Sequence, residues 1–501
     1  MATIAFLLNG TPQRLDVSSD MSILTLLREH LAHTGTKEGC ASGDCGACTV
    51  AIGEPAAERQ IFNSANACIT PAHQLQGKHL VTVEGLGTEK HLHPAQEAMI
   101  ECHGSQCGFC TPGIVMSLFT LHESLTQRPF PLTPELSQER SQERYQELSQ
   151  TRLEATLGGN LCRCTGYRPI RDAALRMRDI PFERPHWYDA TLSEVGGHPA
   201  LSDTAVGTSF FAQPKTLAEL TQLRLKAPQA RLVAGGTDLW LESTQRLMPL
   251  EQLIDITRVA ELLTIEEATL EEQTGWWVGA GVTYTRLEPL FEEHFPAFAH
   301  LLHRLGSQQI RNRGTLGGNI ANASPIGDTP PVLLALGAHV ELASANGTRC
   351  LALEVFFLDY KKTVLAADEV ISRIFIPRAI EDTQLRVWKL SKRREDDISA
   401  VLGAFSYRVE QNVLRDVRIA FGGMAAIPKR AQGAEVALEG NTITQAAFRA
   451  AQKALDDDFH PMSDVRGSQH YRQQAAKNLL ERLYLSLSAS DHEVMLHAYA
   501  H

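Results

Sequence analysis

The sequence lacks any apolar run near the roughly 18 residues that a membrane-spanning helix needs, so it predicts no membrane partner. It also lacks an excess of basic residues, and its net charge of −11 leaves no broad basic surface for nucleic-acid phosphates. The first ten residues lack the basic start of a signal peptide and end in the turn pair Asn9-Gly10. We therefore expect a cytoplasmic protein that does not bind nucleic acid.

Cysteine is nearly absent from the second two thirds of the chain. Nine of the ten cysteines lie before residue 165, and only Cys350 lies beyond it. In a chain without a signal peptide, clustered cysteines indicate metal or redox chemistry rather than disulfides.

The length of 501 residues predicts two to four domains. The order of the periodic segments predicts a small β-rich unit, then a helical unit from about residue 95, then two α+β regions starting near 207 and 385. The predicted strands are 3–8, 13–17, 48–52, 80–83, 231–234, 276–282, 339–342, 370–376, 386–390, 400–410 and 413–421, and the predicted helices are 22–31, 111–125, 151–157, 169–177, 443–455 and 467–487. A Ser/Gln/Glu/Arg near-repeat over 137–150 predicts a solvated insertion, and residues 179–205 have the composition of a linker.

The first cysteine motif is Cys40-x4-Cys45-x2-Cys48, followed by Cys68. This is the plant-type spacing for one [2Fe–2S] cluster. Glycines between the cysteines let the backbone wrap closely around an anionic core and point N–H groups at the sulfurs. The alternative is a zinc site, but zinc sites favour two paired cysteine knuckles rather than three cysteines in one loop.

The second set is Cys107-x2-Cys110 with Cys162-x-Cys164, and its spacing alone leaves three possibilities open. A Cys-x2-Cys pair at a helix start suits a zinc site, a redox disulfide or a second cluster. Both pairs lie beside predicted helix N-termini, where the dipole and the free N–H groups favour an anionic cluster.

Two glycine-rich stretches, residues 232–239 and 314–319, follow predicted strands or loops in the second half. Neither fits Gly-x-Gly-x-x-Gly or a P-loop. Taken singly, each predicts only a tight turn whose N–H groups can approach a phosphate.

Residues 105–113 and 158–170 together resemble the second cluster motif of the molybdenum hydroxylase family, and within it the xanthine dehydrogenases. The resemblance implies a β-grasp ferredoxin domain, a four-helix [2Fe–2S] domain, an FAD domain of the vanillyl-alcohol-oxidase type and a C-terminal α+β domain. The implied ranges are 1–87, 88–180 with an insertion at about 130–150, a linker at 181–205, 206–384, and 385–490. All eight cysteines named above match cluster ligands, and Gln106 matches a position near the pterin of a partner.

The resemblance also implies FAD contacts, and a charged loop at 391–398 matches the loop beside the nicotinamide site. The implied FAD residues are Leu232, Val233, Ala234, Gly235, Gly236, Thr237, Asp238, Leu239, Leu305, Thr315, Leu316, Gly317, Gly318, Asn319, Asp328, Ile371 and Lys389. Asp328 matches an acid that binds a ribose hydroxyl, while Leu305 stands where some relatives have an aromatic residue. In the charged loop, Arg393 and Asp396 are the candidate NAD contacts.

The resemblance thus predicts an electron-transfer subunit of xanthine dehydrogenase, with no catalytic residue of its own. Because the chain ends after the flavin region, we expect the molybdopterin on a large partner subunit, in a heterodimer that pairs into a heterotetramer. Electrons from oxidation of hypoxanthine or xanthine to urate would pass through two [2Fe–2S] clusters to FAD and then to NAD+. The alternatives are the equivalent subunit of a hydroxylase acting on an aldehyde or another N-heterocycle, and a zinc-stabilised module without redox function.

Overall fold

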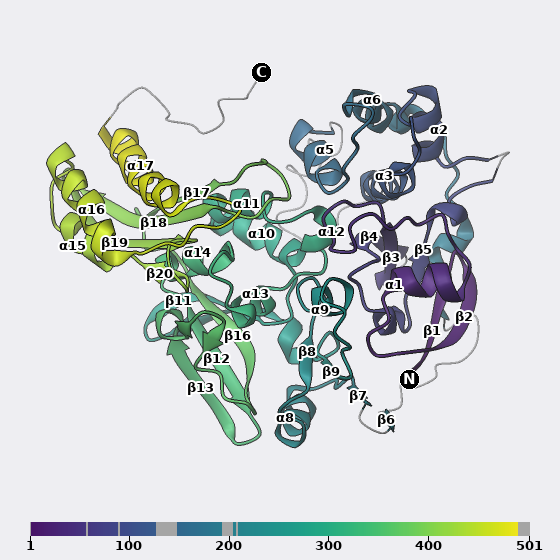
Figure 1. The fold of residues 1–501 in the computed structure, drawn as a ribbon, viewed down its shortest axis with the longest axis horizontal. Helices are drawn as coiled ribbons and strands as arrows, with labels where there is room; N and C mark the ends of the chain where they lie inside the picture. The colour runs from purple at the N-terminus through teal and green to yellow at the C-terminus, as the bar shows by residue number, and fades with distance from the viewer. Residues whose placement is uncertain are drawn as a thin grey trace. The chain divides into compact units, whose positions relative to one another are not determined.

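The computed structural model of the chain describes residues 2–56, 59–88, 91–126, 148–192, 204–206 and 209–488. It divides into two compact units, of which the first comprises Met1–Gln213, Gln229–Thr257 and Gly306–Gly314. The second comprises Pro214–Pro228, Arg258–Leu305 and Thr315–His501. Both units mix helices and strands, as the α+β multidomain prediction requires (Figure 1). Residues 130–147 of the predicted insertion and residues 193–203 of the predicted linker lie outside the described residues.

The first unit begins with a five-stranded sheet in the order β2-β1-β5-β3-β4. Its strands are β1 (Ala2–Leu8), β2 (Thr11–Val17), β3 (Thr49–Ala56), β4 (Arg59–Asn66) and β5 (His79–Val81). Asn9 and Gly10 take φ angles of 49° and 79°, which gives the predicted hairpin turn between β1 and β2. β1 pairs with β5 in parallel and the other pairs are antiparallel, as in a β-grasp sheet.

The predicted helix over 22–31 is shorter and less regular than expected. Ser22 caps α1 (Ile23–Thr25) by accepting a hydrogen bond from the amide of Thr25. The chain then continues as the π-helical turn η1 (Leu26–His30). Ile23, Leu26 and Leu27 are buried in the core of the sheet, so packing rather than regular helix geometry sets this segment.

Four helices of the first unit surround a second apolar core. They are α2 (Pro94–Glu101), α3 (Thr111–Thr126), α5 (Gln150–Leu157) and α6 (Arg168–Arg176). The core includes Ile114, Leu118 and Phe119 of α3, all fully buried. Tyr188, from the described part of the predicted linker, lies in the same core with no exposed surface. The composition of the linker did not predict that Tyr188 is buried. The packing of Tyr188 attaches residues 177–192 to the helices.

A four-stranded sheet in the order β6-β7-β9-β8 completes the first unit. Its strands are β6 (Thr204–Val206), β7 (Ser209–Ala212), β8 (Arg231–Val233) and β9 (Gln252–Asp255). β7 and β8 both run parallel to β9, so their carboxyl ends lie at one edge. Two short helices, α9 (Trp240–Thr244) and α12 (Gln308–Arg311), belong to this part. Phe211, Val233 and Trp240 share one core with the β-grasp sheet.

The second unit contains a five-stranded antiparallel sheet in the order β10-β11-β16-β12-β13. Its strands are β10 (Ile265–Leu270), β11 (Gln273–Gly279), β12 (His339–Ser344), β13 (Gly347–Ala352) and β16 (Val370–Pro377), with a small hairpin of β14 (Phe357–Asp359) and β15 (Lys362–Thr363). The helices beside it are α8 (Leu217–Lys226), α10 (Tyr284–His294), α11 (Pro296–Leu302), α13 (Leu316–Asn322) and α14 (Thr329–Leu336).

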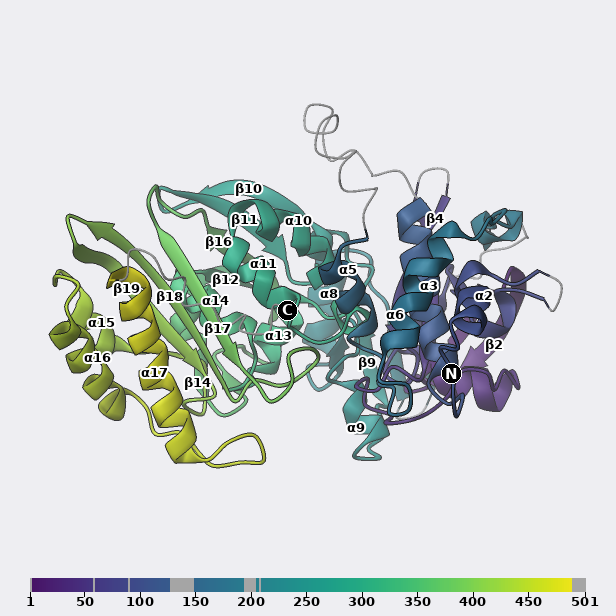
Figure 2. The same ribbon diagram turned by 90° about the horizontal axis from the view of Figure 1, so that it is seen from above.

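The last part of the second unit is an antiparallel sheet with helices on one face (Figure 2). Its strands are β17 (Gln384–Leu390), β18 (Val401–Glu410), β19 (Val413–Gly422) and β20 (Lys429–Arg430). The helices are α15 (Gln432–Leu438), α16 (Gln445–Asp458) and α17 (Gln469–Ser488). The sequence predicted all of these except β20 and α15, which are short.

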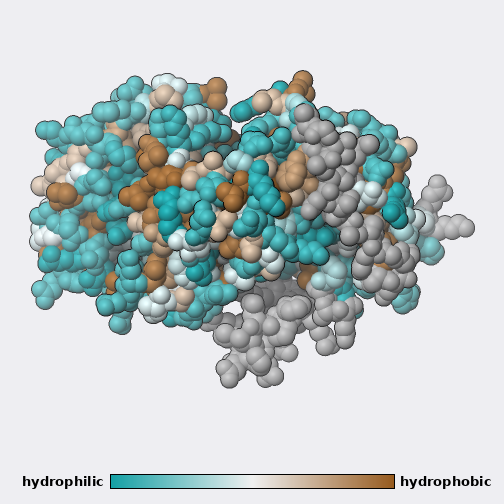
Figure 3. Space-filling model, turned by 90° about the horizontal axis from the view of Figure 1, so that it is seen from below, coloured by the Kyte–Doolittle hydropathy of each residue, from teal (hydrophilic) through white to brown (hydrophobic). Residues whose placement is uncertain are grey.

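Hydrophilic residues cover most of the face drawn in Figure 3, with apolar residues gathered in a few patches between them. In the part of the chain that the structure describes, no helix is long and apolar enough to cross a membrane.

Candidate cofactor sites

The four cysteines of the first motif lie together at the edge of the β-grasp sheet. The Sγ atoms of Cys48 and Cys68 are 3.3 Å apart, and both residues are buried. Cys40 and Cys45 are half-buried, and the backbone amides of Ser42 and Cys45 donate to the Sγ of Cys40 at 3.4 Å and 3.3 Å. Such N–H donors stabilise sulfur that carries negative charge.

The cysteine sulfurs do not form a single tetrahedron. In the first site Cys40 is hydrogen-bonded with Cys45 and Cys68, and Cys68 with Cys40 and Cys48. A zinc ion with four thiolates at 2.3 Å needs all its sulfurs about 3.8 Å from one another. Among the described residues, which include all ten cysteines, no three Sγ atoms lie within 4.8 Å of one another. A [2Fe–2S] cluster needs two cysteines at each of two irons and spreads its four sulfurs more widely than a single zinc ion does, so the observed arrangement fits the cluster better than zinc.

The second set of cysteines is more exposed. The Sγ atoms of Cys107 and Cys164 are 3.6 Å apart and both residues are exposed, while Cys162 is buried. Cys110 hydrogen-bonds Cys162 and directly precedes α3, which supplies the predicted helix N-terminus. Gln106 is exposed beside Cys107. This second site therefore opens to the surface of the first unit.

The thiols cannot all be ionised without a metal. A hydrogen bond from Cys45 lowers the pKa of Cys40, and a hydrogen bond from Cys68 lowers the pKa of Cys48. The pKa values of the donating thiols, Cys45 and Cys68, are raised. Burial raises the pKa of Cys110 to about 12. Within each set some pKa values are lowered and others raised, and a bound iron would supply the positive charge that stabilises all the thiolates.

The two cysteine sites are joined by backbone contacts. The amide of Leu161 donates to the carbonyl of Cys45 at 2.9 Å, and Leu161 directly precedes Cys162. Three glycines lie at this contact between the two cysteine sites: Gly46, Gly113 and Gly159. A Cβ atom at Gly46 would collide with the carbonyl oxygen of Gly159, and one at Gly113 would collide with that of Gly46. Only glycine lets these backbones approach so closely.

A buried polar network fastens the same contact. Asn160 donates to the carbonyl of Gly46 at 3.1 Å and to Thr49 Oγ1 at 3.3 Å, and accepts from Ser117 Oγ at 2.6 Å. Gln309 of α12 donates to Thr49, Ser117 and Asn160 at 3.1–3.3 Å. The sequence did not predict Gln309, because nothing in its local pattern marks a partner some 260 residues away.

The first glycine-rich stretch lies in the first unit, at the carboxyl end of β8. Val233 is buried and Gly236 takes a φ of 79°. A Cβ atom at Gly235 would collide with the carbonyl of Arg313, so the loop lies directly on the 306–314 segment. Residues 234–239 form the loop between β8 and α9, as the sequence predicted from its glycines.

The second glycine-rich stretch lies in the second unit, at the start of α13. Thr315 caps this helix by accepting from the amide of Gly318 at 3.0 Å. Gly317 packs so tightly on Ala280 that a Cβ atom would collide with it. Asn319 Oδ1 accepts from Thr329 Oγ1 at 2.7 Å, which holds the helix to α14.

Asp328 and Lys389, two further predicted FAD residues, form a buried ion pair at 2.7 Å. Asp328 also accepts from Ser399 Oγ at 2.5 Å, and Lys389 donates to the carbonyl of Arg304 at 2.9 Å. A carboxylate has about four acceptor positions. The bonds from Lys389 and Ser399 use two of those on Asp328, which leaves acceptor positions for a ribose hydroxyl.

The remaining predicted residues are spread over the second unit. Leu305 is almost buried just after α11, and Ile371 is buried in β16. Arg393 and Asp396 lie in the charged loop after β17, where the Arg393 amide donates to Asp397 at 2.8 Å and its guanidinium to the carbonyl of Asp396 at 2.9 Å.

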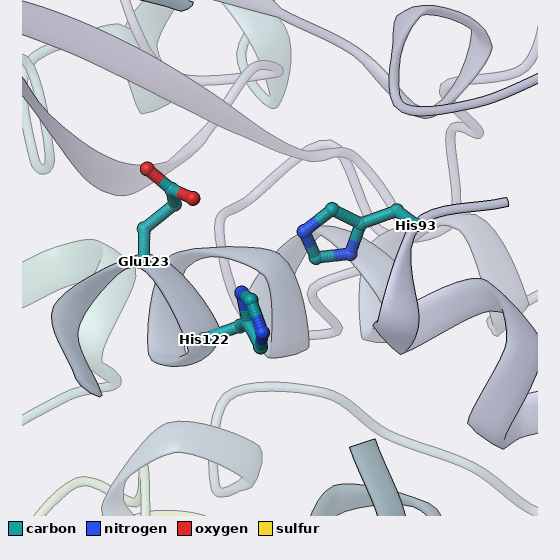
Figure 4. Close-up of side chains that lie close together, drawn as sticks. All are labelled: His93, His122 and Glu123. Atoms are coloured by element: carbon teal, nitrogen blue, oxygen red, sulfur yellow. The ribbon is translucent and has the colours of Figure 1, made fainter. Parts of the chain in front are cut away.

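A buried group of His93, His122 and Glu123, which the sequence did not predict, lies among the four helices (Figure 4). One ligand atom from each lies within 4.8 Å of the others. Burial lowers the pKa of His122 to about 4, and burial together with His122 lowers that of His93. His93 Nδ1 accepts from the amide of Ala95 at 3.1 Å, so in the neutral ring Nε2 carries the proton and cannot bind a cation. The group is therefore a core contact rather than a metal centre.

Comparison with known families matches almost the whole chain. Residues 6–73 match a 2Fe-2S iron-sulfur cluster binding domain and 82–175 a [2Fe-2S] binding domain. Residues 204–379 match the FAD binding domain in molybdopterin dehydrogenase, and 386–487 the CO dehydrogenase flavoprotein C-terminal domain. The chain thus has two [2Fe–2S] binding domains and an FAD-binding domain.

Whole-protein relatives agree with these matches. The chain is 32% identical to a xanthine dehydrogenase of Drosophila pseudoobscura pseudoobscura and to one of Emericella nidulans, over 97% and 96% of its length. It spans only 39% and 38% of those proteins. Its fold resembles a carbon monoxide dehydrogenase from Hydrogenophaga pseudoflava that lacks the Mo-pyranopterin moiety of the molybdenum cofactor, with a TM-score of 0.52 and 31% identity. That match covers 54% of this chain and 94% of the other. Quinoline 2-oxidoreductase from Pseudomonas putida 86 is similar, with a TM-score of 0.51, 29% identity, and 56% and 97% coverage.

Proposed function

Because the chain belongs to the molybdenum hydroxylase family, as an iron–sulfur and FAD-binding chain, we propose that it is the electron-transfer part of a xanthine dehydrogenase. It would carry electrons from a molybdopterin centre to NAD+ while hypoxanthine or xanthine is oxidised to urate. The xanthine dehydrogenases that match 97% of this chain at 32% identity support this substrate class.

The residues proposed to hold the cofactors follow from their positions. Cys40, Cys45, Cys48 and Cys68 would hold one [2Fe–2S] cluster, and the 107/110/162/164 cysteines the other. The two glycine-rich loops, with Asp328 and Lys389, would bind FAD. When bound, the clusters supply one-electron transfer, and FAD converts single electrons into the pair that a hydride carries.

The contact between the two cysteine sites is the observation that carries the proposal. A hydrogen bond joins Leu161, the residue before Cys162 of the second site, to Cys45 of the first site. Asn160 and Gln309 hold both loops in place. This contact brings the two cysteine sites close together, as electron transfer between two clusters requires.

We propose that electrons enter at the exposed Cys107/Cys164 site, leave through the covered first site, and reach FAD last. The molybdopterin would lie on a large partner subunit, in a heterodimer that pairs into a heterotetramer. The match to a carbon monoxide dehydrogenase chain supports separate subunits, because about half of this chain covers 94% of that one. Arg393 and Asp396 are proposed to contact NAD+. We also propose a cytoplasmic location, because clustered cysteines in a chain of this kind indicate metal or redox chemistry rather than disulfides.

Purification of the native complex tests the proposal. Xanthine should reduce NAD+ in the presence of the complex, which should contain a second, molybdopterin-bearing chain. Absence of turnover with xanthine and NAD+ in a preparation with all cofactors present would reject the xanthine dehydrogenase assignment. The second candidate is a hydroxylase of another N-heterocycle or an aldehyde, which the similarity to quinoline 2-oxidoreductase favours. Turnover of such a substrate without turnover of xanthine would select it.

A further inference from the structure

The loop of residues 234–239 rests on a segment of the β-grasp domain. Gly236 lies so close to this segment that a Cβ atom would be 2.8 Å from the carbonyl oxygen of Ile69, the residue after Cys68. Past the loop, Gln245 donates to the carbonyls of Cys40 and Ala41 at 3.1 Å and 2.9 Å. The loop therefore takes its support from the domain that carries the first cysteine motif.

This support lies at the edge where a ligand is expected. β7, β8 and β9 run in parallel, and ligands of such sheets bind outside the carboxyl ends of the strands. Asp255 ends β9 at this edge, and the loop starts there after β8. The short 3₁₀-helix η2 (Ala72–Leu75) of the β-grasp domain meets the same edge through its side chains.

Gln74 of η2 is the residue that reaches the loop itself. Its Nε2 donates to the carbonyl of Ala234 at 2.7 Å and to Asp255 Oδ2 at 3.0 Å. Its Oε1 accepts from the guanidinium of Arg313. Gln74 is 5% exposed and its amide bonds at both ends, so the orientation of the amide is determined.

Gln74 lies between groups of opposite charge, and a neutral amide can donate to one and accept from the other. His73 Nε2 and Asp255 Oδ2, both fully buried, are 2.9 Å apart. Burial alone would raise the pKa of Asp255, but hydrogen bonds from His73 and Thr257 lower it, so Asp255 is a carboxylate. Gln74 thus lies between a carboxylate and a guanidinium, donating to one and accepting from the other. A glutamate here would keep the Arg313 contact but lose the donor for Ala234.

We propose that Gln74, although part of the iron–sulfur domain, is a positioning residue for FAD that holds loop 234–239 in the shape that receives the pyrophosphate. This inference rests on the proposed function of the loop. It implies that the β-grasp domain is needed for flavin binding as well as for electron transfer.

The test is an FAD titration of flavin-depleted full-length protein, in the assembly in which it is isolated, followed by quenching of flavin fluorescence. Gln74→Met should weaken FAD binding about tenfold, because it removes a buried hydrogen bond to the loop. Gln74→Glu should weaken it at least as much. Iron content and the visible spectrum of the clusters should match those of the unmodified protein.

Gln76→Met is the matched control. Gln76 is 6% exposed and accepts from the amide of Ala5 in β1 at 2.8 Å, so its loss perturbs the same domain without touching the loop. It should leave FAD affinity within about twofold of the unmodified value. Unchanged affinity in Gln74→Met, or an equal loss in Gln76→Met, overturns the inference and leaves the proposed function standing. Failure of the unmodified protein to bind FAD rejects the proposed function.

Discussion

Cys45 belongs to the first cysteine site only, so its replacement should distinguish the signal of one cluster from that of the other. Cys45→Ser should remove one of two distinct paramagnetic iron–sulfur signals and leave the other, because Cys107, Cys110, Cys162 and Cys164 keep their own site. Electron paramagnetic resonance of the reduced protein measures this. Cys102→Ser, at a half-buried cysteine outside both motifs, should leave both signals. Loss of both signals in Cys45→Ser would contradict separate sites.

His122 should make the four-helix region sensitive to acid. Its pKa of about 4 in the folded chain lies below the ordinary 6.5, so the unfolded chain binds more protons between these values. Stability is therefore complete above about pH 6.5 and falls as the pH drops towards 4.

His122→Leu should reduce the difference in unfolding free energy between pH 7 and pH 5 by about 2 kcal/mol. Urea unfolding at the two pH values measures it. His30→Asn, at an exposed histidine, is the control and should change nothing. An equal pH dependence in His122→Leu and the unmodified protein would contradict the prediction.

The spacing of the cysteines predicted the first site, because its ligand spacing is largely a local property of the chain, whereas the second site was predicted from the family resemblance of the residues around its two cysteine pairs. The structure then brought each predicted set of four together. Gln74, Gln309 and the His93–His122 contact could not be found in this way. Each depends on residues that meet only after the chain has folded, and a single glutamine or histidine has no spacing signal.

At the scale of elements, the approach of α3 to the first cysteine loop is set by glycine. Gly113→Ala would normally stabilise a helix by about 1 kcal/mol. Here the new methyl group would meet the carbonyl of Gly46, so we expect a loss of about 1–3 kcal/mol and altered spectra of both clusters. Thermal unfolding and the two paramagnetic signals measure this. Thr120→Ala, on a half-buried position of the same helix, should leave both signals unchanged.

The short helix α12 depends on one side chain for its place in the first unit. Gln309→Leu would remove three hydrogen bonds and leave buried acceptors at Thr49 and Asn160 with fewer donors. We expect it to lower the free energy of unfolding by about 2 kcal/mol. Gln308→Leu is the neighbouring control, since Gln308 bonds Asn312 and Arg311 within or beside α12. Equal destabilisation by both changes would contradict a special role for Gln309.

Elements with a strong apolar period were predicted, whatever their length, and elements with a weak period were missed. β18, β19, α16 and α17 have strong periodicity, and their bounds agree within a few residues. β4 and α15 were not predicted, because their apolar spacing gives weak signals. The helix after Ser22 was predicted as regular but turns into a π-helical segment, since packing of its leucines overrides ideal geometry.

At the scale of the whole molecule, metal analysis separates a relay from a zinc-stabilised module. Two [2Fe–2S] clusters predict about four irons per chain, with little zinc, and the FAD site predicts about one flavin per chain. Elemental analysis and a visible spectrum of the purified protein measure this. One or two zinc ions per chain without iron would instead support the structural module.

The segment Gly306–Gly314 has a consequence for how the protein is made. It returns to the first unit long after residue 213, and its Gln309 completes the network between the two cysteine loops. During synthesis, the first unit therefore stays incomplete until residue 314 has left the ribosome, so its closure waits for long-range contacts. Until then the three bonds that Gln309 makes with Thr49, Ser117 and Asn160 are missing, so we expect the two cysteine loops to be held less firmly in the nascent chain than in the finished one.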